Sequence, residues 1–247
     1  MALIVINPGH TGGYNQGICS GYYEGNTMLT LAIYLGNLLR VMGADVKFTR
    51  TTDTENPSVA QRGEMGANAD LYFSLHSNAY DDPSVRGVDV FYSVQRPESE
   101  PLAVRIGNAV AAVMGNQLRR VIAIPSTTNP SRDYYGELRA AVSVGARHAL
   151  LVEHGFHTNM EDCELLSDDA VLRQIAAAEA VVIAQYFDLP ISCLGNYIVQ
   201  PQDSLYGIAQ KFGVTWDSIA LANSIAFPYI IMVGQRIIVP LPAGSVC

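Results

Sequence analysis

The sequence predicts an α/β fold, a mostly parallel sheet covered by helices on both faces (an αβα sandwich), followed by a small C-terminal βααβ module. Strand-length apolar runs alternate with helical patterns through the first 190 residues, which is typical of a largely parallel sheet. Two runs, 71–75 and 149–152, are apolar almost throughout, as strands buried on both faces are. The segment 197–240 then holds two helical patterns between two short strand patterns. We therefore expect a first domain over 1–189, a linker at 190–195 and a second domain over 196–241.

The individual elements follow from capping and periodicity. Asn26 is a good N-cap for a helix that ends at Gly43, and Ser58 is placed to cap a second helix that runs to about Asn68. Helices are also expected around 102–113 and 171–186, and strands at 3–6, 45–49, 71–75, 88–92, 149–152, 197–199 and 236–239.

Composition and charge exclude several classes of protein. An apolar fraction of 49% and a charged fraction of only 15% argue against disorder. The last 57 residues are neutral, so the net charge of −8 lies in the first 190, which disfavours nucleic acid as a partner. No apolar run approaches the ~20 residues that cross a bilayer, so we expect no membrane span, and we expect a monomer.

The apolar residues 1–6 lead directly into Asn7-Pro8-Gly9, as in a buried first strand and unlike a signal peptide. We therefore expect synthesis in the cytoplasm without an export signal, unless the chain has been trimmed. Four cysteines are scattered without a C-x-x-C pair: Cys19, Cys163, Cys193 and Cys247. They could form two disulfides, but in such a chain their scatter favours free thiols, and none is taken as a metal ligand.

Four polar residues lie where predicted strands end. His10 follows the first strand, Glu24 lies in the Gly-rich loop after it, His76 follows 71–75, and Glu153 follows 149–152. Ligand sites in such sheets gather beyond the carboxyl ends of the strands. Two histidines and one carboxylate are a common catalytic zinc set that leaves a fourth position for water, and a further carboxylate must accept the proton of that water.

The residues alone leave alternatives open. The chain has no H-E-x-x-H, His10 could be a turn residue, and Glu24 could be a surface carboxylate. His154 and His157 are rival ligands, although alternation along a strand should point His154 away from the face of Glu153. A carboxylate directly after a buried strand is usually paired or functional. His148, which precedes that strand, is expected at the surface.

The motifs around these residues resemble those of zinc-dependent N-acetylmuramoyl-L-alanine amidases of the amidase-3 family. Asn7-Pro8-Gly9-His10 resembles the D-P-G-H motif of that family, with Asn in place of the common Asp. The other matching segments are Tyr23-Glu24-Gly25-Asn26, Thr49-Arg50 with Arg62 and Ala67-Asn68, Ser74-Leu75-His76-Ser77-Asn78, and Leu151 to Asn159, which reads L-V-E-x-G-F-x-x-N.

The resemblance covers essentially all of residues 1–190, in order, and implies roles for the four residues. His10, Glu24 and His76 would be zinc ligands, and Glu153 the catalytic acid/base. The bond cleaved would join the lactyl group of N-acetylmuramic acid to the L-Ala of the stem peptide, by attack of zinc-activated water. The loss of a charge at Asn7 should alter how His10 is oriented.

The C-terminal segment resembles a LysM domain, whose members bind N-acetylglucosamine-containing glycans. Tyr197 to Leu205 resembles the opening Y-x-V-x-x-G-D-T/S-L of that family, with Gln202 where Gly is usual. Most apolar residues here are expected to pack in a core. The expected glycan-binding residues are Asp203, Ser204, Leu205, Phe227 and Ile230.

The sequence thus predicts a peptidoglycan hydrolase that acts at the bacterial cell wall and is anchored there by its LysM domain. Release by lysis, a holin or a non-classical route fits a phage endolysin and an autolysin or sporulation enzyme about equally. The rival hypotheses are a non-catalytic wall-binding protein of the same fold and a zinc carboxypeptidase that cuts elsewhere in the stem peptide.

Overall fold

The computed structural model describes residues 1–190 and 193–241. Its main feature is a six-stranded sheet in the order β2-β1-β3-β6-β4-β5. All neighbouring strands are parallel except β4, which runs antiparallel to β6. The strands are β1 (Leu3–Pro8), β2 (Asp45–Phe48), β3 (Leu71–Asn78), β4 (Val88–Tyr92), β5 (Leu118–Ile122) and β6 (His148–Phe156).

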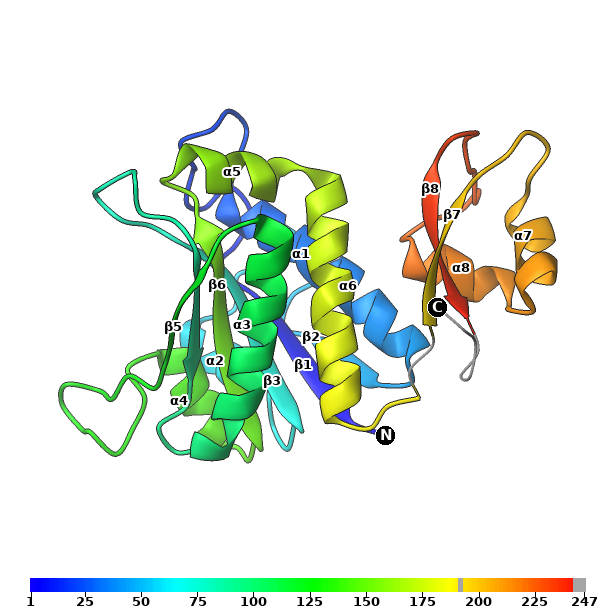
Figure 1. Ribbon diagram of the computed structural model, residues 1–247. Coiled ribbons are helices and arrows are strands. Elements are labelled where there is room, and N and C mark those ends of the chain that lie inside the picture. The colour runs from blue at the N-terminus through cyan, green and yellow to red at the C-terminus, as the bar shows by residue number, and fades with distance from the viewer. Residues whose placement is uncertain (191–192, 242–247) are drawn as a thin grey trace.

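Helices cover both faces of this sheet, which confirms the predicted αβα sandwich (Figure 1). One face packs against α1 (Glu24–Val41), α3 (Glu100–Met114) and α6 (Asp169–Tyr186), and the other against α4 (Gly136–Ser143), which pairs with α2 (Val59–Glu64). A short helix, α5 (Met160–Ser167), follows β6, and the 3-10 turn η1 (Pro97–Ser99) precedes α3. Within the described residues, no helix is both long and apolar enough to span a membrane.

Strand alternation assigns each side chain of the central strands to one of these faces. In β3, Leu71, Phe73 and Leu75 join the core beneath α1, α3 and α6, whereas Tyr72 joins the core beneath α4. Because alternate side chains point to opposite faces, Ser74 and His76 lie on the α4 face with Tyr72. The same alternation puts the side chains of Asn7 in β1 and Glu153 in β6 on the α4 face.

Three of the elements whose boundaries differ from the predicted ones carry residues of the site. Helix α1 begins at Glu24 after the extended residue Tyr23, so Glu24 lies in the first helical turn and Asn26 is not the N-cap. The Asn26 side chain instead accepts a hydrogen bond from Gly13 N. His76 and Glu153 lie inside longer strands, not after them. The polar residues at the ends of both strands continue the parallel pairing. A prediction based on runs of apolar residues therefore ends each strand too early.

Helix α2 confirms the cap at Ser58, whose side chain and that of Gln61 form a reciprocal capping box, but it ends at Glu64. The apolar and helical patterns of the sequence did not predict β5, α4 and α5. His148 was wrongly expected at the surface: it is 9% exposed at the start of β6, and its Nδ1 lies 2.9 Å from Ser99 Oγ.

The C-terminal module is the predicted βααβ unit, with β7 (Cys193–Ile198), α7 (Leu205–Phe212), α8 (Trp216–Ala222) and β8 (Arg236–Leu241). Strand β7 begins at Cys193, within the segment 190–195 expected to be a linker, and residues 191 and 192 lie outside the described residues. The module packs on the first domain through α8 and α1. Asn37 donates to Ser224 Oγ, and Arg173 donates to the carbonyl of Asn223.

Cys19 and Cys163 form a disulfide, so the prediction of free thiols was wrong for this pair. The bond joins the loop that precedes α1 to helix α5. The two cysteines are 144 residues apart in the sequence, and only the fold brings these segments together. The local sequence pattern therefore could not predict the pairing. Cys247 lies outside the described residues.

Candidate metal centre

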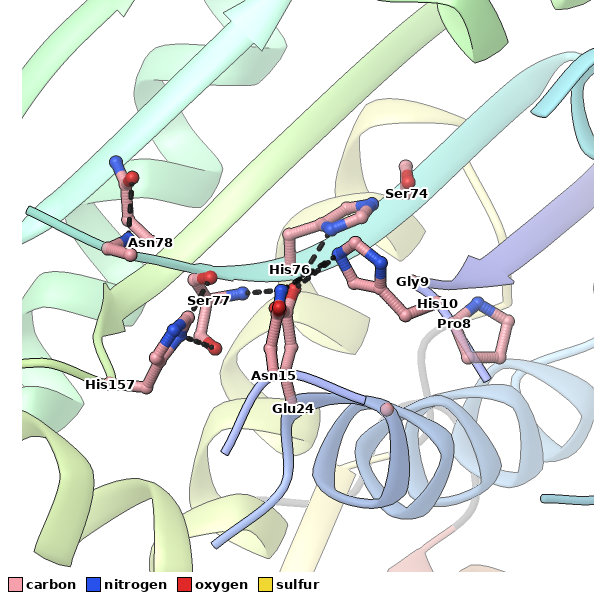
Figure 2. Close-up of polar contacts among 12 residues, drawn as sticks. Pro8, Gly9, His10, Asn15, Glu24, Ser74, His76, Ser77, Asn78 and His157 are labelled. Atoms are coloured by element: carbon pink, nitrogen blue, oxygen red, sulfur yellow. Dashed lines mark hydrogen bonds and ion pairs between the residues drawn. The ribbon is translucent and has the colours of Figure 1, made fainter. Parts of the chain in front are cut away.

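His10, Glu24 and His76 lie together at the carboxyl end of the sheet. One ligand atom from each lies within 4.8 Å of the others, and among the described residues no other group of at least three His, Cys, Asp or Glu side chains meets this criterion. Glu24 Oε1 lies 2.9 Å from His76 Nδ1 and 3.4 Å from His10 Nε2. Figure 2 shows both imidazole rings turned toward the carboxylate of Glu24 at the start of α1.

The turn after β1 brings His10 to this point. A Cβ atom on Gly9 would lie 2.5 Å from Cε1 of the His76 ring, so only glycine lets the backbone pass so close to that ring. His10 itself has a positive φ of 56°, in the left-handed region that a side chain seldom adopts.

Two buried arginines hold that turn. Arg50 donates to the carbonyls of Gly9 and Gly25, and Arg62 donates to the carbonyl of His10 at 2.7 Å. These bonds connect the His10 turn to the first turn of α1, where Glu24 lies. The T-R and R motifs of the sequence therefore have a structural role next to the cluster.

The carboxylate of Glu24 is fully buried and multiply bonded. Its Oε1 accepts from Ser77 N at 3.1 Å, and its Oε2 accepts from Asn15 Nδ2 at 2.6 Å. Burial opposes the charged form, but hydrogen bonds to His10 and His76 outweigh burial and hold the pKa of Glu24 well below its ordinary value. The side chain is thus anionic at neutral pH, as a metal ligand must be.

Glu153 lies on the strand beside His76. The two residues are register partners in the parallel pair β3–β6. Burial raises the pKa of Glu153 to about 8, and its Oε2 is a buried atom with no hydrogen-bond partner among the described residues. A carboxyl group with a raised pKa and a free oxygen is suited to accept and return a proton.

Glu137, on α4, is a site residue that the sequence reading missed. Its Oε1 accepts from Ser74 Oγ at 2.6 Å and lies 3.3 Å from His76 Nε2. Its Oε2 accepts from Asn7 Nδ2 at 3.2 Å. A signal was present: Glu137 precedes Ala141 by one helical turn on the buried stripe of α4, where a charge needs a partner.

The rival histidines lie elsewhere. His154 points to the opposite face of the sheet, as alternation predicted, where its Nε2 is 2.9 Å from Oε1 of Glu179 on α6. His157 Nδ1 lies 2.9 Å from Ser77 Oγ, and its ring stacks on Tyr22. Neither belongs to the three-residue cluster.

The donor set suits a divalent cation. Glu24 lies against both imidazoles and Glu137 against that of His76, while Glu153 Oε2 is buried without a hydrogen-bond partner among the described residues. Two histidine nitrogens and one carboxylate oxygen are ligands typical of catalytic zinc. A cavity of about 300 Å³ adjoins the cluster and is lined by His10, Tyr14, Val59, Arg62, His76 and Glu137, among others.

In the C-terminal module, the expected glycan-binding residues divide into two groups. Leu205 is 5% exposed in the core, Asp203 accepts hydrogen bonds from Tyr197 and Gln200, and Ser204 caps α7. Each of these three side chains thus has a contact within the module. Phe227 and Ile230 are 84% and 69% exposed and lie on the loop before β8.

Comparison with known proteins agrees with this architecture. The model of the family described as N-acetylmuramoyl-L-alanine amidase (Amidase_3) matches residues 4–185, and that of the LysM domain matches residues 197–240. The chain is 26% identical over 221 residues to N-acetylmuramoyl-L-alanine amidase AmiA of Escherichia coli, covering 75% of this chain and 76% of that protein. It is also 26% identical over 209 residues to amidase CwlM of Bacillus licheniformis, covering 81% and 74%.

The chain is also similar in structure to solved proteins. The amidase AmiC2 of Nostoc punctiforme superposes with a TM-score of 0.62 at 26% identity, covering 76% of this chain and 97% of that one. Cwp6 from Clostridium difficile superposes with a TM-score of 0.64 at 25% identity over 74% of this chain and 29% of that one.

Proposed function

This chain belongs to the N-acetylmuramoyl-L-alanine amidase family, and from that premise we propose that it is a zinc enzyme in which His10, Glu24 and His76 hold the ion and Glu153 transfers the proton. The bond hydrolysed is the amide between the lactyl group of N-acetylmuramic acid and L-Ala. The observation that supports this best is the register pairing of His76 with Glu153, which puts a half-buried carboxyl group, whose Oε2 is buried, beside the ligand cluster.

The residues of the chain perform distinct steps. When bound, a zinc ion polarises a carbonyl and lowers the pKa of water. Glu153 accepts the proton of the water that attacks the lactyl carbonyl carbon, and it returns that proton to the nitrogen of L-Ala as the C–N bond breaks. Its pKa, which burial raises to about 8, suits a group that both takes and gives a proton near neutral pH.

The LysM domain would hold the glycan strand near the site. Tethering raises the effective concentration of substrate without adding catalytic contacts. Helix α1 contacts both the ligand cluster and the LysM domain. Glu24 is its first residue, and Asn37, 13 residues later, contacts the LysM domain. At the ~1.5 Å rise per residue of an α-helix, these points are roughly 20 Å apart. Phe227 and Ile230 supply the exposed apolar surface that we propose contacts the sugar rings.

Digestion of purified peptidoglycan by the full chain tests this function. Glu153→Gln keeps the size of the side chain but removes its basic oxygen, so we expect it to bind zinc and to lose nearly all turnover. Retained turnover would show that another group carries the proton.

The identity of the new amino terminus separates the rival functions. Release of an L-Ala amino terminus supports the amidase, whereas release of a diamino acid or D-Ala supports the carboxypeptidase. A wild-type protein that holds much less than one zinc per chain and lyses no walls would be a non-catalytic binding protein. Phage lysis and sporulation both stay predictions for the biological context.

A further inference from the structure

Glu137 is 6% exposed, and its carboxylate contacts three groups that all lie on one face of the sheet. Ser74 Oγ donates to it at 2.6 Å, Asn7 Nδ2 donates at 3.2 Å, and His76 Nε2 lies 3.3 Å away. Asn7, Ser74 and His76 are on adjacent strands, and Asn7 and Ser74 are register partners. The helix that covers this face brings the carboxylate directly above them.

The two nitrogens of His76 face different partners. Nδ1 lies 2.9 Å from Glu24 Oε1, within the ligand cluster, whereas Nε2 lies 3.3 Å from Glu137 Oε1. A neutral imidazole that binds a metal through one nitrogen carries its hydrogen on the other, and a carboxylate that accepts this hydrogen fixes the ring and its tautomer.

We propose that Glu137 is a positioning residue for His76, and that Asn7 is the partner that allows this carboxylate to be buried there. The proposal rests on the proposed function, because it assumes that His76 is a metal ligand. Glu137 accepts the Nε2 hydrogen of His76 and so directs Nδ1 toward Glu24 and the cation.

The hydrogen bonds of Asn7 explain why this position is not the Asp of the D-P-G-H motif. Thr49 Oγ1 donates to Asn7 Oδ1, so the amide nitrogen is the atom that faces Glu137 and Ser74. An Asp side chain has no hydrogen to donate, and it would bring a second carboxylate within about 3 Å of the first in a buried site. Asp at position 7 and Glu at position 137 therefore exclude one another, whereas Asn7 and Glu137 are complementary.

A double-mutant cycle on the full chain tests the pairing, with the zinc dissociation constant from chelator competition as the measurement. We expect Glu137→Gln to weaken zinc binding by about 10- to 100-fold, as loss of a ligand's hydrogen-bond partner does. Asn7→Asp should weaken it comparably, because of the repulsion between the two carboxylates. In the double variant that repulsion is absent, so its affinity should equal that of Glu137→Gln. If the fold losses of zinc affinity in the two single variants instead multiply in the double variant, Asn7 does not act through Glu137.

Glu179→Gln is the matched control. Glu179 is also a buried carboxylate 2.9 Å from a histidine Nε2, but that histidine is His154 on the opposite face of the sheet. We expect this change to lower thermal stability while zinc affinity stays within threefold of wild type. Equal losses of zinc affinity in Glu179→Gln and Glu137→Gln would reduce Glu137 to a structural role and overturn the proposal.

The ring nitrogens of His76 give a test that needs no variant of Glu137. In 15N NMR spectra of the zinc-loaded wild-type protein, we expect His76 to bind through Nδ1 and to carry its hydrogen on Nε2. Binding through Nε2 would overturn the proposal.

The failures can be told apart. A wild-type protein that holds zinc and hydrolyses peptidoglycan, but whose Glu137→Gln variant binds zinc as tightly, contradicts this inference alone. A wild-type protein that holds no zinc contradicts the proposed function, and the inference with it.

Discussion

His76 and Glu153 occupy paired positions on the adjacent parallel strands β3 and β6. Alternation along both strands points the two side chains to the same face of the sheet. The pairing brings one of the proposed metal ligands and the proposed proton carrier together through main-chain hydrogen bonds, which makes their relative position a property of the sheet and not of a loop. Sites built on strands are held more closely than sites built on loops.

Zinc should stabilise the protein, because only the folded chain brings His10, Glu24 and His76 together. At a free zinc concentration 100 times the dissociation constant, the expected gain is about 2.7 kcal/mol. For a chain of this size that gain raises the melting temperature by roughly 5–10 °C. Differential scanning calorimetry with and without a chelator measures the shift. The His10→Ala variant should show little zinc-dependent rise in melting temperature. A rise equal to that of wild type would place the ion elsewhere.

Gly9→Ala should disturb His76 directly. The added methyl group would lie 2.5 Å from the imidazole ring, so the ring or the turn must move. We expect weaker zinc binding and a loss of turnover of at least tenfold, both measured on purified protein. Gly207→Ala is the control, since its methyl group would meet Ser204 Oγ at 3.4 Å and disturb nothing near the cluster. Unchanged zinc affinity in Gly9→Ala would show that the turn can yield.

The disulfide should contribute to the free energy of unfolding. Cys19 and Cys163 close a long loop, with a sequence separation of 144 residues. Removal of a native disulfide typically costs about 2–5 kcal/mol, chiefly because the unfolded chain is less constrained. Urea unfolding of the Cys19→Ser/Cys163→Ser variant, compared with wild type under oxidising conditions, should show that loss. A reducing agent should destabilise wild type and leave the variant unchanged; a reductant effect of equal size on both would exclude this bond as the cause.

Binding to the cell wall should depend on Phe227 and Ile230, which are largely exposed. Replacement of both by Ser should reduce co-sedimentation with insoluble peptidoglycan by about tenfold and leave the melting temperature within about 1 °C, because exposed side chains contribute little to stability. Met160→Ser, at another exposed apolar residue, is the control. Full retention by the double variant would place the glycan contact on another surface.

Acid should weaken the contact between helices α1 and α6. Burial opposes the charge of Asp169, but hydrogen bonds from Tyr34 and Arg173 outweigh it and hold the pKa of Asp169 below its ordinary value of 3.8. Because this pKa is lowered in the folded state, the charged carboxylate stabilises the fold at pH values above its ordinary pKa. This stabilisation disappears as the pH falls through the folded-state pKa. Because the site is mostly exposed, the effect should stay under about 1 kcal/mol. Unfolding free energies of wild type and Asp169→Asn should differ at pH 7 and approach one another as the pH falls below 3.8; a constant difference down to the most acid pH would rule out this titration.

Much of the fold could be predicted because its strands are apolar runs and its long helices are strongly periodic. Runs 71–75 and 149–152 lie within β3 and β6, and the helix expected around 171–186 is α6. The reading was wrong where polar residues continue a strand or open a helix, as at His76, Glu153 and Glu24. Local pattern cannot distinguish a polar residue that ends an element from one that the sheet or helix carries into the site.

The sequence by itself determined the fold class and the family, and it predicted the four residues of the proposed reaction, because each lies in a local motif or directly beside a periodic element. Only the tertiary structure showed that His76 is paired with Glu153. Only the tertiary structure also brought Glu137 of α4 onto Asn7 of β1, 130 positions away in the chain. Local sequence encodes which elements form, but the contacts between two buried polar groups depend on which helix covers which face, and that depends on packing across the whole domain.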